Sequence, residues 1–397
     1  MRVSLNPFLL IGGNSGGDAQ GDILVNIEFL VGSRYGDELY GSDQANLVYG
    51  MEGNDVLVGG GGGDQLDGGP GEDELDGGDG ADYMIGGTGN DRYFVNHADD
   101  VVIEYGDEGL DTDNARIDGD HVEYPEDGGI DTVNAWTNYT LPEHVENLVL
   151  LDGGGGVSGT GNDGDNAIAG NELSNLLNGA GGGDTLKGAG GDDFLDGGTG
   201  ADLMLGGEGG DIFIVNDAGD VVTEHAGEGF DMVQTSVSYS LAAGSEIEVL
   251  YADPATITAA IDLVGNEFDN FLTGNDGANI LAGGLGLDTL RGKGGGDVFL
   301  WSSVAESSPS HPDVVADFNR AEGDVLHFTS VDADDTVAGD QNFTFIDTAA
   351  FTAPGQINWF TNGTDTFIQL NTNADSAADA VIQVNGVHTV DASWFFL

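Results

Sequence analysis

Aspartate recurs at every ninth residue within three blocks of this sequence. In GGTGADLML (197–205) it is the sixth residue of a unit that opens with glycine and has an apolar residue at the eighth place. Stacked copies of this unit would bring their carboxylates into a row of like charges. Such rows of oxygen ligands suit hard divalent cations. Calcium fits best, because it accepts about six to eight oxygens in irregular geometry.

The nonapeptide units fall into three blocks, 32–94, 161–214 and 265–300, which hold seven, six and four units. Twelve units place aspartate at the sixth position, and we predict these residues as metal ligands: Asp37, Asp55, Asp64, Asp73, Asp82, Asp91, Asp184, Asp193, Asp202, Asp211, Asp288 and Asp297. The other five place asparagine there: Asn46, Asn166, Asn175, Asn270 and Asn279. The asparagine units lie at or near the start of each block, as is typical of capping repeats.

The unit itself explains how these residues are positioned. Glycine accepts positive φ and close backbone approach, so the first six residues can turn and the last three can form a short strand. The apolar eighth residue then points inward, two units make one turn of a flattened right-handed coil, and stacked turns build parallel sheets. The sequence therefore predicts an all-β fold: parallel β-roll (β-solenoid) blocks, interspersed β segments and a C-terminal β cap.

The core of such a coil is thin. Its eighth residues, among them Leu57, Leu66 and Phe213, bury little area per residue, whereas the many glycines lose much backbone entropy on folding. Apolar burial alone should therefore barely stabilise the fold. Cations between the carboxylates would supply the missing stabilisation, so metal binding would be coupled to folding.

The composition restricts the possible partners. Of 397 residues, 70 are glycine, 71 are Asp or Glu and only 8 are Lys or Arg, which gives a formal net charge of −63. This charge argues against nucleic acid, whose phosphates need clusters of Lys and Arg, and against anionic membrane surfaces. No apolar run approaches the roughly 18 residues of a membrane helix, so we expect no membrane insertion. With no cysteine and with dispersed histidines, we expect no soft-metal site.

Two related segments separate the blocks. DRYFVNHADDVV (91–102) matches DIFIVNDAGDVV (211–222) at an offset of 120 residues, and the segments between the blocks alternate apolar and polar residues as β-strands do. The sequence predicts an N-terminal lead-in segment at 1–31, β-roll block 1 at 32–94, a β-rich spacer at 95–160, block 2 at 161–214, a second β-rich spacer at 215–264, block 3 at 265–300 and the C-terminal cap at 301–397.

The units GGTGNDRYF, GGTGADLML and GGEGGDIFI resemble the haemolysin-type calcium-binding nonapeptides of RTX proteins, which form parallel β-rolls. In that family each calcium is held between loops by aspartates of units i and i+2 and by loop carbonyls. The resemblance implies about 11 complete sites here, weak or empty where they use asparagine, which brings no charge. It adds loop residues as ligands: Gly59, Gly62, Gly68, Gly71, Gly77, Gly80, Gly86, Gly89, Gly188, Gly197, Gly200, Gly206, Gly209, Gly283 and Gly286.

The tail resembles a second family. Residues 292–397, from GGGDVFLWSSVAESSPSHPDVVADFNRAEGDVLHF to GVHTVDASWFFL, are similar to the C-terminal domain of serralysin-type metalloproteases. In that family the domain caps the β-roll and carries an uncleaved signal for the type I secretion apparatus. The resemblance implies a secreted, extracellular bacterial protein, exported without an N-terminal signal peptide. Such a chain would stay unfolded at low cytosolic calcium and fold outside the cell.

We expect no catalytic site. The sequence has no HExxH motif, and the G-x-S-x-G match GNSGG (13–17) lacks the preceding strand and following helix of a nucleophile elbow. Segment 111–120 misses the spacing of an EF-hand calcium loop, and 371–379, with fewer acidic ligands, is interpreted as a turn.

The leading interpretation is a secreted calcium-binding β-roll protein without catalysis. Two alternatives stay open. The chain could be the C-terminal, non-catalytic part of a secreted hydrolase or polysaccharide-modifying enzyme. It could also be a structural surface protein or adhesin with a cell-surface or glycan partner.

Overall fold

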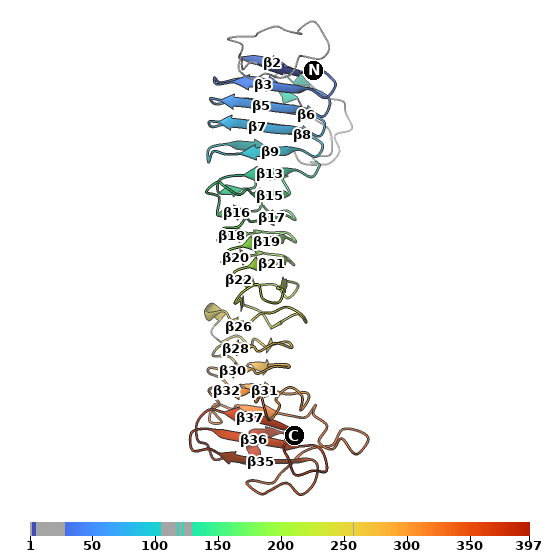
Figure 1. Ribbon diagram of the computed structural model, residues 1–397, viewed down its shortest axis with the longest axis vertical. Coiled ribbons are helices and arrows are strands. Elements are labelled where there is room, and N and C mark those ends of the chain that lie inside the picture. The colour runs from blue at the N-terminus through green and yellow to red at the C-terminus, as the bar shows by residue number, and fades with distance from the viewer. Residues whose placement is uncertain (1, 5–27, 105–116, 119–120, 123–128, 257) are drawn as a thin grey trace. The chain divides into compact units, whose positions relative to one another are not determined.

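The computed structural model describes residues 2–4, 28–104, 117–118, 121–122, 129–256 and 258–397 (Figure 1). Most of the predicted lead-in at 1–31, the GNSGG motif and most of segment 111–120 lie outside the described residues. The chain divides into two compact units, Met1–Leu203 and Met204–Leu397. Among the described residues the only helices are two short 3-10 turns, η1 (Pro254–Thr256) and η2 (Ala392–Trp394), neither of which could cross a membrane. The prediction of an all-β fold is confirmed.

The first unit is a parallel β-solenoid whose successive strands alternate between sheets. One sheet contains β1 (Arg2–Ser4), β3 (Glu38–Ser42), β5 (Val56–Gly61), β7 (Glu74–Asp79), β9 (Arg92–Val95), β13 (Thr132–Ala135), β15 (Asn147–Leu150), β17 (Ala167–Ala169) and β19 (Thr185–Gly190). A second contains β2 (Phe29–Val31), β4 (Leu47–Tyr49), β6 (Gln65–Pro70), β8 (Tyr83–Thr88) and β10 (Val101–Ile103), and a third contains β14 (Tyr139–Thr140), β16 (Ser158–Thr160), β18 (Leu176–Asn178) and β20 (Phe194–Asp196). β11 (Ile117–Asp118) pairs antiparallel with β12 (His121–Val122).

The register of these sheets follows the nonapeptide repeat. Leu57 on β5 pairs with Leu39 on β3 and with Leu75 on β7, each 18 residues away in the sequence. Eighteen residues are two nonapeptides, so two units make one turn of the coil, as predicted. The eighth-position side chains point into the coil and are buried; in the first unit they are Leu39, Val48, Leu57, Leu66, Leu75, Met84, Tyr93, Ile168, Leu177, Leu186 and Leu195.

The spacer at 95–160 adds turns to the same sheet as the blocks on either side of it. Val133 on β13 pairs with Tyr93 of the first block and with Leu148 on β15. Leu148 in turn pairs with Ile168 of the second block. The spacer therefore continues the coil through turns whose length departs from 18 residues.

The second unit has the same architecture. One sheet contains β22 (Ile212–Val215), β24 (Met232–Thr235), β26 (Val249–Ala252), β28 (Phe271–Thr273), β30 (Thr289–Arg291) and β32 (Val314–Val315), paired in parallel. The other contains β25 (Tyr239–Ser240), β27 (Leu263–Val264), β29 (Ile280–Ala282), β31 (Val298–Leu300), β33 (Val325–His327) and β38 (Phe395–Phe396), also parallel. Two further strands are β21 (Leu203–Glu208) and β23 (Val221–Thr223).

The C-terminal segment extends one sheet of the second unit, drawn in red in Figure 1. β37 (Ala380–Val384) pairs in parallel with β32, and β36 (Thr366–Asn371) and β35 (Gln356–Thr361) then add antiparallel strands. β34 (Thr344–Phe345) completes the sheet beside β35. The strand β37 thereby covers β32, which would otherwise present unpaired backbone groups at a sheet edge.

Candidate metal centres

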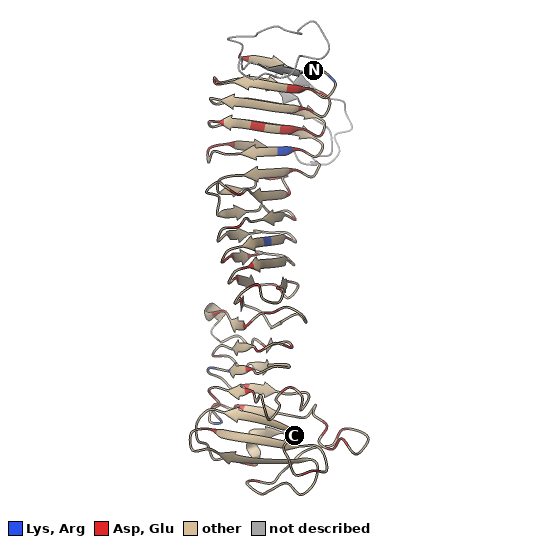
Figure 2. Ribbon diagram, in the orientation of Figure 1, with Lys and Arg blue, Asp and Glu red and all other residues tan. Residues whose placement is uncertain are grey.

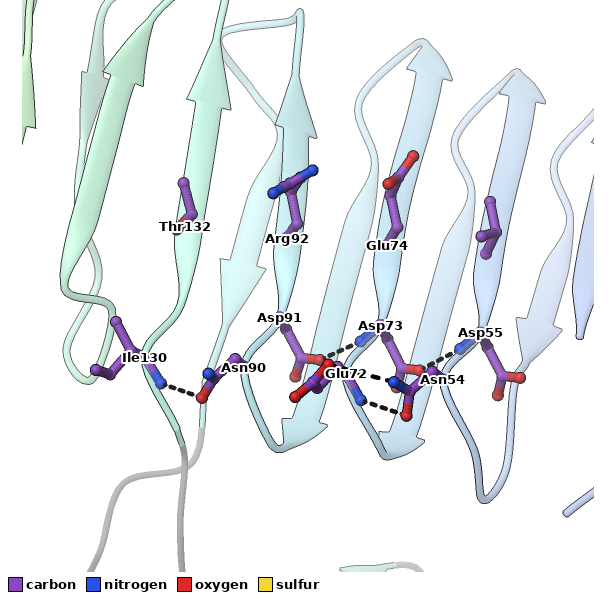
Figure 3. Close-up of a pocket in the computed structure, with 11 residues that line it drawn as sticks. Asn54, Asp55, Glu72, Asp73, Glu74, Asn90, Asp91, Arg92, Ile130 and Thr132 are labelled. Carbon is purple, nitrogen blue, oxygen red and sulfur yellow. Dashed lines mark hydrogen bonds between the residues drawn. The ribbon is translucent and has the colours of Figure 1, made fainter. Parts of the chain in front are cut away.

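The sixth-position aspartates form hydrogen-bonded ladders along the edges of the coil. Asp55 Oδ1 accepts a bond from the backbone N–H of Asp37 at 2.6 Å, and Asp73 and Asp91 do the same for Asp55 and Asp73 at 2.7 Å (Figure 3). The same bond joins Asn46 to Asp64, Asp64 to Asp82, Asn166 to Asp184, Asn175 to Asp193, Asp184 to Asp202, Asn270 to Asp288 and Asn279 to Asp297. One carboxylate oxygen of each turn is thus used to hold the previous turn.

The second oxygen of these carboxylates is buried without a hydrogen-bond partner among the described residues. This holds for Oδ2 of Asp55, Asp64, Asp73, Asp82, Asp91, Asp184, Asp288 and Asp297. All eight side chains are almost completely buried. A buried carboxylate that lacks a partner for its charge costs several kcal/mol, so eight of them in one coil require compensation.

A small space beside each such oxygen exists because the first residue of the unit is glycine. A Cβ on Gly50 would lie 2.3 Å from Asp55 Oδ2 and 2.6 Å from the carbonyl oxygen of Gly68, one turn further along. Among the predicted ligands, the carbonyls of Gly59, Gly68, Gly77, Gly86, Gly188, Gly197 and Gly283 face the first glycine of the preceding turn in this way. Carboxylate and carbonyl oxygens around one space are the donor set of a hard cation, so the residues fit calcium.

The other predicted glycines are required by the backbone. The fourth-position residues have positive φ, between 113° and 159°: Gly62, Gly71, Gly80, Gly89, Gly200, Gly209 and Gly286. A Cβ on Gly80 would also collide with the carbonyl of Gly62 in the previous turn. Stacked loops can therefore approach this closely only with glycine at the fourth place.

Burial without a partner raises the pKa of these carboxyl groups. Loss of solvation is the largest cause throughout, and neighbouring carboxylates add to it at several of the sites. The pKa is raised to about 6 for Asp55, Asp64 and Asp82, to about 7 for Asp73, Asp184 and Asp297, and to about 8 for Asp91 and Asp288. A cation in the adjacent space would favour the charged form and oppose these shifts.

In the asparagine units the buried sixth side chain is neutral and is satisfied by hydrogen bonds, without a cation. Asn270 Oδ1 accepts from the N–H of Asn266 at 2.9 Å, and its Nδ2 donates to the carbonyl of Ile247 at 2.7 Å. Asn279 is bonded in the same way, to the N–H of Asn275 and the carbonyl of Ile261. The amide satisfies both polar atoms, which supports the expectation that these loops hold calcium weakly or not at all.

The two loop types differ at their second residue. In the asparagine loops this residue is Ser42, Asn162, Asn171, Asn266 or Asn275, and its N–H donates to the sixth side chain. In aspartate loops it is usually glycine, and it has positive φ even where it is Met51, Ala180, Ala189 or Lys293. The identity of the second residue is a sequence signal that the nine-residue phase alone does not reveal.

Asp37 was predicted as a ligand, but its loop resembles the asparagine loops. Its Oδ2 accepts from the N–H of Ser33 at 2.6 Å and from the Ser33 hydroxyl at 2.9 Å. The structure therefore separates Asp37 from the other predicted aspartates.

The ladder continues into residues outside the predicted repeat blocks. Asp100 accepts from the N–H of Asp82 at 3.0 Å and Asp131 from that of Asp91 at 2.6 Å. In the second unit the same role falls to Asp231, Asp313 and Asp324, which accept from Asp211, Asp288 and Asp297. Asp100 keeps the nine-residue phase and was missed because its segment, 95–103, opens with valine and not glycine. The other acceptors were missed because the turns that carry them are not 18 residues long.

A hollow of about 350 Å3 lies along one of these ladders (Figure 3). Its walls include Asp55, Asp73 and Asp91 together with the fifth-position residues of the same turns. Of these, Asn54 Nδ2 donates to Glu72 Oε2 at 3.3 Å. The fifth position thus adds a second line of bonds between turns, beside the carboxylates.

The loop 371–379 is closed by its own hydrogen bonds. Asp379 accepts from the N–H of Thr372 at 2.7 Å and from Asn373 Nδ2 at 2.6 Å, and Asn371 Nδ2 donates to the carbonyl of Ala377 at 2.7 Å. Since the loop uses its acidic residues internally, the geometry supports the interpretation of this segment as a turn.

Acidic side chains are distributed along both units, with few basic ones among them (Figure 2). Comparison with known proteins identifies the repeats. The RTX calcium-binding nonapeptide repeat matches residues 31–66, 58–93, 178–213 and 264–299, and no curated protein matches the chain.

One similar solved structure is that of the extracellular lipase LipA from Serratia marcescens, with 18% identity over 68% of this chain and 45% of the lipase chain and a TM-score of 0.26. This chain thus spans less than half of the lipase, and the likeness is too distant to bear on function. The four repeat matches and the parallel β-solenoid fit a haemolysin-type repeat protein with RTX calcium-binding nonapeptide repeats.

Proposed function

We propose that this chain is a secreted calcium-binding β-roll protein and that extracellular calcium drives its folding. The observation that carries the proposal is the row of buried aspartate oxygens without hydrogen-bond partners among the described residues, each beside the first glycine of its unit. At Asp55, Asp64, Asp73 and Asp184 a loop carbonyl of the next turn borders the same space. Calcium would supply positive charge to these rows.

The ligands of each ion would come from consecutive turns of one edge. Asp55 and Asp73, for example, stand one turn apart on the same edge, and Gly68 directs its carbonyl to the space beside Asp55. The aspartate would provide charge, the carbonyls would complete the oxygen shell, and the glycines would leave room for both. Sites with asparagine in place of aspartate would be weaker, because charge count sets calcium affinity.

Calcium dependence of folding follows from the balance of forces. A net charge of −63 opposes compaction, and 70 glycines add a large entropy cost. The apolar core is a line of single side chains such as Leu57 and Leu75. Without cations these terms favour the unfolded chain, which suits passage through a secretion apparatus.

The proposed location is extracellular, with export by a type I secretion apparatus. RTX repeats support this, because they are typical of secreted proteins, and so does the resemblance of the tail to a domain that carries such a signal. Export would be tested by expressing the chain with a type I apparatus and assaying the medium. Removal of residues 301–397 should abolish export if the signal lies there.

We propose no catalytic role for this chain. The described histidines form local bonds: His225 with Glu228, His327 with Thr329, and His388 with the carbonyl of Asn385. Hydrolysis of protein, ester or glycan panels by the pure calcium-loaded chain would contradict this and favour an enzymatic role.

The decisive experiment is a calcium titration followed by far-UV circular dichroism. It starts in EDTA and rises to about 10 mM calcium, a range suited to weak extracellular sites, with magnesium as control. A cooperative gain of β signal with calcium alone is expected. A chain already folded in EDTA would refute calcium-driven folding, and a chain that binds no calcium would refute the function itself.

A further inference from the structure

A cluster of three buried acidic residues lies where the first nonapeptide block passes into the spacer. Asp91 and Asp131 precede β9 and β13 of one sheet, whereas Glu104 follows β10 of the other. Oxygen atoms of the three side chains all lie within 4.8 Å of one another. Glu104 is therefore brought from one sheet to the carboxylate ladder of the other, and it belongs to no nonapeptide.

Two of these side chains present oxygens that lack hydrogen-bond partners in the described part of the chain. They are Asp91 Oδ2 and Glu104 Oε2, on residues only 2% and 6% exposed. The other Glu104 oxygen accepts from the hydroxyl of Tyr93. Unpartnered oxygens this deeply buried, beside further carboxylates, call for a positive charge.

A space for that charge lies at Gly86. A Cβ on Gly86 would come within 2.1 Å of the Tyr93 hydroxyl and 2.3 Å of both Asp91 Oδ2 and Glu104 Oε1. Three oxygens from three residues thus converge on a volume that any other residue at position 86 would fill.

A related set of acidic residues lies in the other unit, but among the described residues only the first set brings oxygens of three carboxylates within 4.8 Å of one another. Asp211 and Asp231 precede β22 and β24, and Glu224, which is 1% exposed, follows β23. A Cβ on Gly206 would lie 2.1 Å from Asp211 Oδ2 and 2.2 Å from Glu224 Oε1.

The second set differs in its contacts. Both carboxylate oxygens of Glu224 accept from backbone N–H groups, Oε1 from Gly206 at 2.7 Å and Oε2 from Gly207 at 3.4 Å, and Phe213 occupies the place that Tyr93 has in the first set. Glu224 therefore lacks the unpartnered oxygen that Glu104 presents.

We propose that the cluster Asp91–Glu104–Asp131 is a calcium site of its own kind, completed by Glu104 from outside the nonapeptides and resting on the proposed calcium-binding function. It gathers three carboxylates around one dication, which is a higher ligand charge than an aspartate with loop carbonyls provides. The site would lock the transition from the first block to the spacer, where the nonapeptide repeat stops.

The competing account is a neutral glutamic acid that serves only as a hydrogen-bonding group. Burial and the neighbouring Asp131 carboxylate raise the pKa of Glu104 to about 9. Without a cation it would hold a proton at neutral pH. Substitution by glutamine separates the two accounts, because glutamine keeps the shape and the hydrogen bonds but cannot supply the charge.

The test measures calcium bound per full-length chain by elemental analysis after equilibrium dialysis, at the lowest free calcium that saturates the wild type. Glu104→Gln is expected to bind one ion fewer, with β structure retained. Glu52→Gln, at an exposed loop residue, is the matched control and should bind the full number, and so should Glu224→Gln, whose glutamate has both oxygens bonded to backbone N–H groups. Tyr93→Phe should also keep the full number, because the tyrosine supplies no charge.

The outcomes distinguish this inference from the function on which it rests. An unchanged calcium number in Glu104→Gln would overturn the junction site and leave the β-roll function intact. A wild type that binds no calcium would overturn both. If Glu104→Gln does not regain its β signal in excess calcium, Asp131→Asn decides, because asparagine removes one of the three charges and keeps an oxygen that can accept from the backbone N–H of Asp91.

Discussion

Asp73 Oδ1 accepts the backbone N–H of Asp55 at 2.7 Å, while Oδ2 of the same side chain is buried without a hydrogen-bond partner in the described structure. One carboxylate therefore has two functions. It joins one turn to the previous turn, and its second oxygen carries charge that no described residue stabilises by a hydrogen bond. The carboxylates that link the turns therefore also destabilise the fold. Whether their net contribution to stability is favourable depends on the presence of a cation.

Replacing Asp73 by asparagine should change stability in opposite directions with and without calcium. In EDTA the variant should be more stable by about 1–3 kcal/mol, because an unpaired buried charge is removed and the new amide faces the carbonyl of Gly86. In calcium it should be less stable, with a midpoint on the order of ten-fold higher, because a charged ligand is lost. Urea unfolding and calcium titration by circular dichroism measure both effects.

Asp79→Asn is the matched control for that experiment, because it removes the same charge from an exposed position of the same block. Its calcium midpoint should stay close to that of the wild type. Equal shifts in the two variants would show that overall charge, and not the ladder position, determines calcium affinity.

Gly50→Ala should weaken calcium binding without straining the backbone. Gly50 is not among the residues with positive φ, but its Cβ would enter the space between Asp55 Oδ2 and the Gly68 carbonyl. We expect a calcium midpoint on the order of ten-fold higher, measured by circular dichroism, with fewer ions bound at limiting calcium. Gly155→Ala is the control, since a Cβ there meets no atom within 4 Å. A normal midpoint for Gly50→Ala would mean that the ion does not use this space.

The fold could be predicted from the sequence because the nonapeptide phase specifies it directly. A residue such as Leu57 lies inside, and Asp55 lies at the turn, because of their places in a nine-residue unit; the strand register of 18 residues then follows. Both the parallel coil and the row of aspartates could therefore be predicted from the sequence.

The remaining features depend on contacts that the phase does not encode. Glu104 meets Asp91 only because the spacer continues the coil and returns the chain to the same edge. The different hydrogen bonding of Asp37 follows from Ser33, whose N–H donates to the carboxylate. The identity of the second residue of each unit could have predicted this difference at Asp37. The contact between Glu104 and Asp91 required the three-dimensional structure.

Asn270→Asp should destabilise the chain and create no calcium site. The substitution removes the Nδ2 donor to the carbonyl of Ile247, and the loop lacks the left-handed second residue of the aspartate loops. We expect a loss of about 1–3 kcal/mol in saturating calcium, measured by urea unfolding, with an unchanged number of bound ions. Asn385→Asp, at an exposed position, should be neutral. An additional ion bound at no cost in stability would show that the two loop types are equivalent.

The metal-free fold should gain stability as the pH falls. Burial raises the pKa of Asp73 to about 7 and that of Asp91 and Asp288 to about 8, from 3.8. At pH values between the unfolded-state pKa of 3.8 and the folded-state pKa of about 7 or 8, the folded state binds more protons than the unfolded chain. The free energy of unfolding therefore decreases as pH rises from about 4 to about 8. In EDTA, β structure should therefore be greater at pH 5 than at pH 8. In saturating calcium the direction should reverse, because protons compete with the ion for the same carboxylates. Circular dichroism and urea midpoints at both pH values test this, and the same pH dependence with and without calcium would show that these carboxylates do not bind the ion.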